Sequence, residues 1–262
     1  MTYRNCIICN SSHDVENYCE MEGLLYVRCD NCGLIYVNKF ASKQQMDQAY
    51  TGGAFKSFRR KLLGPFRKMR NISGHKHWTQ RASQMFQFVK SVKKNNEPGK
   101  MLDIGANKGF LLEQALKDGH DVYGVELVRE TMLPFITTYP KFTNNIFFER
   151  FSKVSNKFSN DFFDIITATD VLEHLEDPVE DVKNIYRILK KSGIFVAQTP
   201  DVDCENAVNQ KCKWPSLNPL EHLHLFGRKN IIKFAKDIGF SDVQVYDAVE
   251  DADGALMVVM EK

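Results

Sequence analysis

The sequence lacks the long apolar runs that membrane-spanning helices require. No stretch among its 262 residues approaches about 18 consecutive apolar residues, which excludes a transmembrane helix on this criterion. The first residues, Met1–Cys6, lack the apolar core of a secretory signal peptide, so we expect the protein in the cytoplasm. Internal repeats and low-complexity segments are also missing. With 43% hydrophobic and 26% charged residues, the composition is that of an ordinary globular protein and excludes disordered and collagen-like chains.

Acidic residues are missing from a long internal segment. No Asp or Glu occurs between Asp47 and Glu97. The same segment contains twelve cations: Lys56, Arg59, Arg60, Lys61, Arg67, Lys68, Arg70, Lys76, Arg81, Lys90, Lys93 and Lys94. Because the whole chain has a net charge of only +2, the remainder is net acidic. This asymmetry indicates an anionic partner, either a phosphate-bearing small molecule or, alternatively, a nucleic acid.

Four of the seven cysteines form two closely spaced pairs, Cys6-x-x-Cys9 and Cys29-x-x-Cys32. In a reducing cytoplasm such pairs indicate a metal site rather than disulfides. Two such turns about 20 residues apart present four thiolates tetrahedrally, which is the pattern of a zinc ribbon. We therefore predict a zinc-ribbon-like module over residues 1–45 with a structural Zn²⁺ bound by all four thiolates. The three other cysteines receive no role: Cys19, Cys204 and Cys212.

Residues 46–95 are predicted to form a basic helical cap or linker, with a break at Gly64-Pro65. The second of its helices has an apolar face: Trp78, Ala82, Met85, Phe86, Val89 and Val92. Two interpretations remain open. The segment is either a cap that holds an anionic group of the substrate, or a pair of amphipathic helices with solvated basic faces.

Residues 96–262 alternate short apolar runs with helical patterns, which predicts a parallel sheet. The predicted strands are Lys100–Ile104, Asp121–Glu126, Ile146–Phe148, Phe163–Thr169, Gly193–Gln198, Val243–Asp247 and Ala255–Met260. The last two are close in sequence and are expected to form an antiparallel hairpin at the sheet edge. The predicted fold is therefore α/β, with a Rossmann-like, doubly wound, seven-stranded sheet and a small N-terminal zinc-binding module.

The strongest chemical signal is the strand–turn–helix segment Met101–Leu112, which contains Asp103 and Gly105. Glycine lets the backbone approach a ligand closely. The next apolar run ends on Glu126, 21 positions beyond Gly105, which suits a grip on ribose hydroxyls. A dinucleotide-binding fold would require G-x-G-x-x-G, a pattern that Ala106-Asn107-Lys108 interrupts.

The order Asp-x-Gly-x-x-x-Gly followed by Glu resembles the nucleotide site of class I S-adenosylmethionine-dependent methyltransferases. Asn107 replaces the usual middle glycine of that family, and Asn tolerates the positive φ that such a turn needs. The resemblance continues through Phe162–Pro178 and Ile188–Val196 and covers residues 75–262. The loop Asp170–His174 also resembles that of ubiquinone-pathway O-methyltransferases.

The resemblance implies S-adenosylmethionine as cofactor and a role for each matching residue. Asp103 and the Gly105 turn would hold the methionine end, Glu126 would bind the ribose, and Leu127 would pack on the adenine. The complete implied set is Asp103, Gly105, Ala106, Asn107, Gly109, Phe110, Glu126, Leu127, Asp170 and Val171, of which the last two would line the methyl side.

A hydroxyl acceptor requires a base, and two histidine clusters offer one. In the ubiquinone-pathway enzymes, acidic residues and a histidine of the first loop can hold a divalent metal, so Asp170 and Glu173 could bind Mg²⁺. The favoured alternative is that Glu173 and His174 only shape the start of the next helix. In the second cluster, an extended segment would project His222 and His224 to one side, at a pKa suited to a base; otherwise these histidines cap the loop. The predicted catalytic residues are His222, His224 and His174.

Three functions are compatible with these observations. The first is O-methylation of a small molecule, such as a sugar or a nucleotide- or lipid-activated glycan intermediate, and a zinc module before this fold also resembles deoxysugar methyltransferases. The alternative is a ribosomal RNA base N-methyltransferase that uses the zinc module and the cations to hold RNA phosphates. The third, a binding module on a degenerate fold, is disfavoured because Asp103 and Glu126 are both present.

Overall fold

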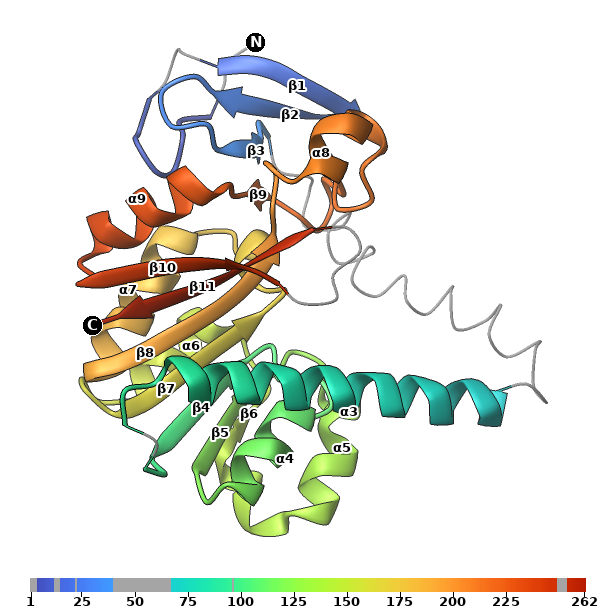
Figure 1. The fold of residues 1–262 in the computed structure, drawn as a ribbon, viewed down its shortest axis with the longest axis vertical. Coiled ribbons are helices and arrows are strands. Elements are labelled where there is room, and N and C mark those ends of the chain that lie inside the picture. Colours follow the sequence, from blue (N-terminus) through green and yellow to red (C-terminus); the bar gives the residue numbers. More distant parts are fainter. Residues whose placement is uncertain (1–3, 12–14, 22, 40–66, 96, 249–253) are drawn as a thin grey trace.

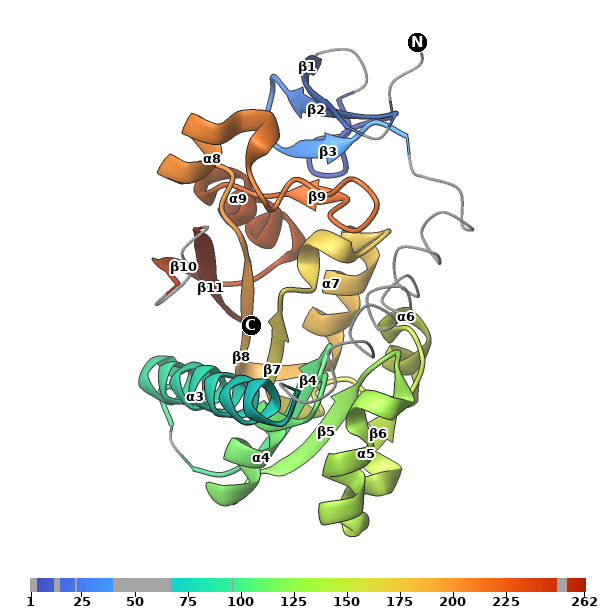
Figure 2. The same ribbon diagram turned by 90° about the vertical axis from the view of Figure 1, so that its right-hand side faces the viewer.

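The computed structural model describes residues 4–11, 15–21, 23–39, 67–95, 97–248 and 254–262 (Figure 1). These residues form two sheets, one of seven strands and one of four. The smaller sheet lies at one end of the molecule, beyond the large sheet and the helices around it (Figures 1 and 2). The predicted break at Gly64-Pro65 and the first four cations of the basic segment, Lys56 to Lys61, lie outside the described residues.

The large sheet has the doubly wound arrangement that the sequence predicts. Its order is β10 (Asp242–Asp247), β11 (Ala255–Glu261), β8 (Leu189–Pro200), β7 (Phe163–Thr169), β4 (Lys100–Ile104), β5 (Asp121–Val125) and β6 (Ile146–Phe147). Neighbouring strands from β6 to β8 are parallel, whereas β11 is antiparallel to both β8 and β10. The predicted antiparallel hairpin at the edge is therefore confirmed. The strand β8 is longer than predicted because it begins at Leu189 rather than Gly193.

Helices cover both faces of this sheet because successive residues of its buried strands point to opposite sides. Met101 belongs to the core on one side and Leu102 to the core on the other. The helices of the first side are α3 (Arg67–Val92), α4 (Phe110–Lys117) and α5 (Arg129–Thr138). Those of the second side are α6 (Phe151–Val154), α7 (Pro178–Ile188) and α9 (Arg228–Ile238). The shorter elements are α8 (Glu205–Gln210), η2 (Pro140–Asn145), η3 (Ser155–Lys157), η4 (Leu172–His174) and η5 (Lys211–Lys213).

The helix α3 is the second helix predicted in the basic segment. Its C-terminal half packs with α4 in one core cluster through Ala82, Met85, Phe86 and Val89, as predicted. Trp78 does not follow this pattern, because it is 44% exposed and lies before the part of α3 that joins the core. Although α3 has 26 residues, neither it nor any other described helix is both long and apolar enough to cross a membrane.

Three cations in the C-terminal half of α3 or directly after it contact carboxylates of this same chain. Arg81 pairs with Asp170, Lys90 with Asp118, and Lys94 with Glu261, at N···O distances of 2.9, 2.6 and 2.7 Å. These cations therefore hold α3 against the acidic remainder of the chain. Such exposed or half-exposed pairs contribute little stability each, about 0–1 kcal/mol.

The four-stranded sheet combines three strands near the N-terminus with one strand from much later in the sequence. Its order is β1 (Val15–Met21), β2 (Leu24–Cys29), β3 (Ile35–Val37) and β9 (His224–Leu225). The strands β2 and β3 are short runs rich in apolar residues that flank the second cysteine pair. The strand β9 has only two residues and exists because it pairs with β3, at Ile35↔Leu225 and Tyr36↔His224. The module also packs against the large domain, since Val27 and Leu34 share a core with Ile231 of α9.

A disulfide joins Cys19 of β1 to Cys212 of η5. The sequence assigned these two cysteines no role, and they are 193 positions apart. Their partnership depends on the packing of the module against the segment after β8, which no local pattern reveals. Cys204 is not part of this disulfide.

Candidate active site

The predicted cofactor residues gather at one edge of the large sheet. From β4 the chain continues to β5 on one side and later returns to β7 on the other, so the ends of β4 and β7 mark the switch point where doubly wound sheets bind ligands. The turn after β4 contains Gly105, with a φ of 75°. A Cβ on Gly105 would lie 2.6 Å from Cγ2 of Val171 in the turn after β7. Only glycine therefore fits here, and the two turns are in contact.

The turn continues with two more residues of positive φ. Asn107 has a φ of 49°, which confirms the expectation that Asn can replace the usual glycine. Gly109 has a φ of 75° and immediately precedes α4, and a Cβ there would lie 2.6 Å from the Phe135 ring. Ala106 is buried under the turn and Phe110 begins α4 half-buried. The result is a cradle of backbone at a helix N-terminus, which favours polar or anionic groups.

The Glu126 carboxylate closes the cradle on the side of β5. Its Oε2 accepts a hydrogen bond from the backbone N–H of Asn107 (2.8 Å), and its Oε1 accepts one from that of Val128 (2.9 Å). Leu127 is 54% exposed beside it. A half-buried carboxylate next to an exposed apolar side chain fits a ribose next to an adenine ring, as the sequence predicts.

Asp103 lies at the end of β4 and is 4% exposed. Its strand register places it opposite Thr167 of β7, whose Oγ1 donates to Asp103 Oδ1 at 2.7 Å. Burial raises the pKa of Asp103 to about 7. A cationic methionine end of a bound cofactor would favour the ionised form. Sequence reasoning missed Thr167, because only the pairing of β4 with β7 brings it to Asp103.

Asp170 follows β7 with a φ of 55°. Its carboxylate accepts hydrogen bonds from Arg81 of α3 (2.9 Å) and from the Gln198 side chain (3.3 Å). In the sequence Arg81 is only one of the twelve cations of the basic segment, yet the fold places it at the predicted methyl side of the cofactor site.

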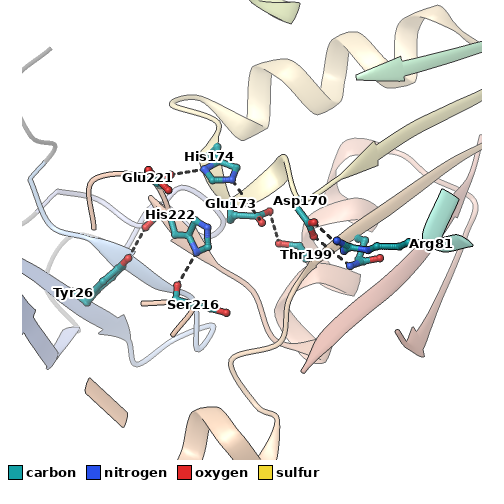
Figure 3. Close-up of polar contacts among 10 residues, drawn as sticks. Tyr26, Arg81, Asp170, Glu173, His174, Thr199, Ser216, Glu221 and His222 are labelled. Carbon is teal, nitrogen blue, oxygen red and sulfur yellow. Dashed lines mark hydrogen bonds and ion pairs between the residues drawn. The ribbon is translucent and has the colours of Figure 1, made fainter. Parts of the chain in front are cut away.

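The turn η4, directly after Asp170, carries a buried carboxyl and an imidazole (Figure 3). Glu173 is 1% exposed and accepts a hydrogen bond from the Thr199 hydroxyl at 2.9 Å. The His174 and His222 rings meet edge to face, with centroids 4.7 Å apart. One ligand atom from each of Glu173, His174 and His222 lies within 4.8 Å of the others. The fold thus joins both predicted histidine clusters.

The contacts of these residues bear on the predicted Mg²⁺ site. Mg²⁺ prefers oxygen ligands, whereas this cluster offers two imidazoles and one carboxyl group. The other predicted ligand, Asp170, is paired with Arg81. The alternative interpretation agrees better with the contacts, since Glu173 and His174 connect the turn after β7 to Thr199 and to the carbonyl of Glu221.

Hydrogen bonds fix the tautomers of both rings. The Nδ1 atom of His222 lies 2.7 Å from the carbonyl oxygen of Ser216, and that of His174 lies 2.8 Å from that of Glu221. Because a carbonyl can only accept, each Nδ1 carries the proton and each Nε2 keeps a lone pair. Burial, together with the neighbouring His174, lowers the pKa of His222 from 6.5 to about 4, so this imidazole is neutral at pH 7. The near-neutral pKa expected from the sequence is therefore wrong for His222, because the fold buries the ring.

Glu173 holds its proton at neutral pH. Burial and the neighbouring Asp170 carboxylate raise its pKa from the ordinary 4.5 to about 8. Because the folded value is above that of the unfolded chain, the stability that Glu173 contributes is fully present below pH 4.5. It decreases as the pH rises towards 8.

The variant Glu173→Gln should therefore be more stable than the wild type at pH 9 and nearly equal to it at pH 5. Glutamine keeps an oxygen for the Thr199 hydroxyl but has no charge to bury. The expected gain at pH 9 is on the order of 3–5 kcal/mol. Urea unfolding at the two pH values measures it, with Glu176→Gln, an exposed carboxyl on the same loop, as control. A constant difference between variant and wild type at all pH values would contradict the raised pKa.

His224 has surroundings different from those of His222. It is 0% exposed, and its Nε2 lies 2.7 Å from the Arg4 guanidinium. Burial and the Arg4 charge lower the pKa of His224 to about 3. The fold therefore places this histidine between the module and the large domain, and not beside His174.

The four predicted zinc ligands form one cluster. All four Sγ atoms lie within 4.8 Å of one another, with Cys6–Cys32 at 3.4 Å and Cys9–Cys29 at 3.5 Å. Four thiolates at about 2.3 Å from a tetrahedral Zn²⁺ would lie about 3.8 Å apart, so the set fits this metal. Both turns have the same backbone geometry. The residue after the second cysteine has a positive φ in each, 55° at Asn10 and 77° at Gly33. Their N–H groups donate to the carbonyls of Cys6 and Cys29.

Comparison with known proteins relates the large domain to enzymes. The profile of a family described as "Methyltransferase domain" matches residues 77–245. A ubiquinone biosynthesis O-methyltransferase of Aliivibrio fischeri (strain MJ11) is 24% identical over 95 residues, which are 36% of this chain and 41% of that protein. The chain therefore spans about two fifths of the length of this curated relative.

Solved structures share the fold at low sequence identity. The 1,6-didemethyltoxoflavin-N1-methyltransferase of Burkholderia thailandensis is 15% identical, with a TM-score of 0.55 over 94% of this chain and 99% of that one. A SAM-dependent methyltransferase of Archaeoglobus fulgidus is also 15% identical, with a TM-score of 0.54 over 69% of this chain and 92% of that one. At this identity the likeness concerns the fold alone.

Proposed function

This chain belongs to the methyltransferase domain family, and we propose that it transfers a methyl group from S-adenosylmethionine to a hydroxyl group of a small molecule. The family match and the shared fold confirm the predicted resemblance to S-adenosylmethionine-dependent methyltransferases. The backbone cradle around Gly105 and the Glu126 carboxylate are the features that would hold the cofactor. When bound, the cofactor supplies an electrophilic methyl group on a sulfonium.

His222 is proposed as the general base. The observation that carries this role is its tautomer, because Nδ1 is bound to the Ser216 carbonyl and Nε2 is left to accept a proton. In the proposed reaction the cofactor would supply the methyl group to the acceptor oxygen, and Nε2 of His222 would take the hydroxyl proton that this oxygen loses. Glu173, protonated and buried, adds no negative charge beside the approaching hydroxyl.

A small polar acceptor, such as a sugar or an activated glycan intermediate, is the proposed substrate class. The curated relative named as an O-methyltransferase supports hydroxyl chemistry, although the chain covers only part of its length. The zinc centre is proposed to be structural, because its four ligands are all protein thiolates and leave no open position.

Titration of the protein with S-adenosylhomocysteine tests the cofactor site. We expect the variant Glu126→Gln to bind about 30-fold more weakly, because a hydrogen bond to a charged group contributes about 2 kcal/mol and 1.4 kcal/mol is tenfold. The exposed Glu130, in the first turn of α5, provides the control variant Glu130→Gln. The absence of binding by the folded wild type would reject the proposed function.

Transfer of labelled methyl groups to a panel of sugar nucleotides and glycans tests the acceptor class. Label in an alkali-stable ether is the expected product of O-methylation. If wild-type protein that binds S-adenosylhomocysteine transferred no label to any hydroxyl compound, the acceptor proposal would fail and the cofactor proposal would stand.

A further inference from the structure

The segment that carries His222 is held by the zinc-ribbon module. The strand β9 directly follows it and forms the fourth strand of the module's sheet, paired with β3. The backbone N–H of Val37, at the end of β3, donates to the carbonyl of Leu223 at 3.0 Å. The chain thus leaves the large domain after β8, adds a strand to the module and returns to α9 (Figure 2).

Tyr26 of β2 contacts His222 itself. Its hydroxyl donates to the backbone carbonyl of His222 at 2.7 Å, as Figure 3 shows. The Tyr26 side chain is 0% exposed and shares a core cluster with Val37 of the module and with Trp214 of the segment after β8, so packing sets the direction of this hydroxyl. One residue of the zinc-ribbon module therefore fixes the backbone of the proposed base.

The other side of the segment contacts the turn after β7. The N–H of Leu223 donates to the carbonyl of Glu173 at 2.6 Å, and Nδ1 of His174 donates to the carbonyl of Glu221 at 2.8 Å. Residues 221–223 belong to no helix or strand. Within their own turn, the N–H groups of Glu221 and His222 donate to the carbonyl of Asn218, and the other hydrogen bonds come from the module on one side and from η4 on the other.

On the basis of the proposed function, we propose that the zinc-ribbon module is a positioning device for the methyl-transfer site, in which β3 and Tyr26 hold His222 beside Glu173 and His174. The module is small, and the four-thiolate cluster joins the turn before β1, with Cys6 and Cys9, to the end of β2 and the turn after it, with Cys29 and Cys32. Its geometry therefore depends on the metal, because a region of this size has little core of its own. The zinc centre would act on the reaction through the backbone of residues 222–225 and not by contact with either substrate.

The physical basis is the sensitivity of proton transfer to distance. A buried carbonyl that loses its donor must find another or move towards water. Loss of the Tyr26 hydroxyl would therefore displace His222, whereas β3 would still hold the segment two residues further on. Displacement of the reacting groups by about 1 Å is enough to reduce a rate about 100-fold.

A matched pair of tyrosines in the module provides the test. Tyr36 is also 0% exposed, and its hydroxyl donates to the carbonyl of Arg4 at 2.8 Å, so Tyr36→Phe removes an equivalent buried hydrogen bond without touching His222. The measurement is the pH titration of the His222 imidazole by nitrogen NMR, with the signal assigned by its loss in His222→Gln. The groups facing this ring are His174 and Glu173 of η4, Asp170 before it, and Glu221 in its own segment.

Tyr26→Phe should raise the titration midpoint of His222 by about one pH unit, because a loosened segment admits water, while Tyr36→Phe should leave it within about 0.3 units. Equal shifts in the two variants, or no shift in either, would overturn the proposal. S-adenosylhomocysteine affinity should stay within about twofold of the wild type in both variants.

Removal of zinc with a chelator provides the second measurement. The His222 signal should move to the position of an exposed histidine, whereas S-adenosylhomocysteine should still bind with an affinity within about threefold of the untreated protein. An unchanged His222 signal without zinc would overturn the positioning role. Loss of both properties would show that zinc supports the whole fold, which also overturns it. Failure of the untreated protein to bind S-adenosylhomocysteine would instead count against the proposed function.

Discussion

Replacement of His222 by glutamine is expected to reduce the rate of methyl transfer by about 10²- to 10⁴-fold, the range that a positioned general base contributes. Glutamine is close to histidine in size and can still donate a hydrogen bond to the Ser216 carbonyl, but it cannot accept a proton at pH 7. The affinity for S-adenosylhomocysteine should stay within about twofold of the wild type, because no cofactor-binding backbone contacts this side chain. Single-turnover transfer of a labelled methyl group measures the first quantity, and calorimetry measures the second.

The pH profile and a control separate the base from a merely structural histidine. Since burial and His174 lower the pKa of His222 to about 4, the rate of the wild type should be limited by protonation of this ring only below about pH 5. His77 is an exposed histidine on α3, and His77→Gln should leave the rate unchanged. A His222→Gln variant that keeps the wild-type rate would remove His222 from the mechanism and leave His174 to be tested in the same way.

Substitution of Cys29 by serine is expected to abolish zinc binding and unfold the N-terminal module. Cys29 is 0% exposed and supplies one of the four thiolates. Structural Zn²⁺ contributes about 10–16 kcal/mol of binding energy to small domains, far more than the core of a three-stranded module can replace. Metal analysis should show one equivalent of zinc in the wild type and none in the variant, and limited proteolysis should cleave within β1–β3.

Cys204 provides the matched control. It lies outside the cluster, and its Sγ accepts a hydrogen bond from the N–H of Ala207 at the start of α8. Serine is a good residue at this position, so Cys204→Ser should keep both the zinc and the resistance to protease. If Cys29→Ser still contained a full equivalent of zinc, the metal would not be bound by the predicted four ligands.

Local signals were enough to predict most of the large domain. The strands β4 and β7 have the predicted bounds, because strands buried on both faces read as short apolar runs. The turn at Gly105 and the position of Asn107 also follow from local chemistry, because few residue types tolerate positive φ. The clustering of Cys6, Cys9, Cys29 and Cys32 follows from the spacing of metal ligands in the sequence, which is a local property too.

The sequence by itself determined the fold class, the family, the cofactor cradle and the four-cysteine cluster, since each of these depends on residues close together in the chain. Only the tertiary structure decided which histidine lies beside Glu173, because His222 and His224 have similar local patterns but different neighbours. The same holds for Thr167 at Asp103, for Arg81 at Asp170 and for the addition of β9 to the module. The last three contacts join residues at least 64 positions apart, and strand register and domain packing, which no short pattern encodes, bring them together.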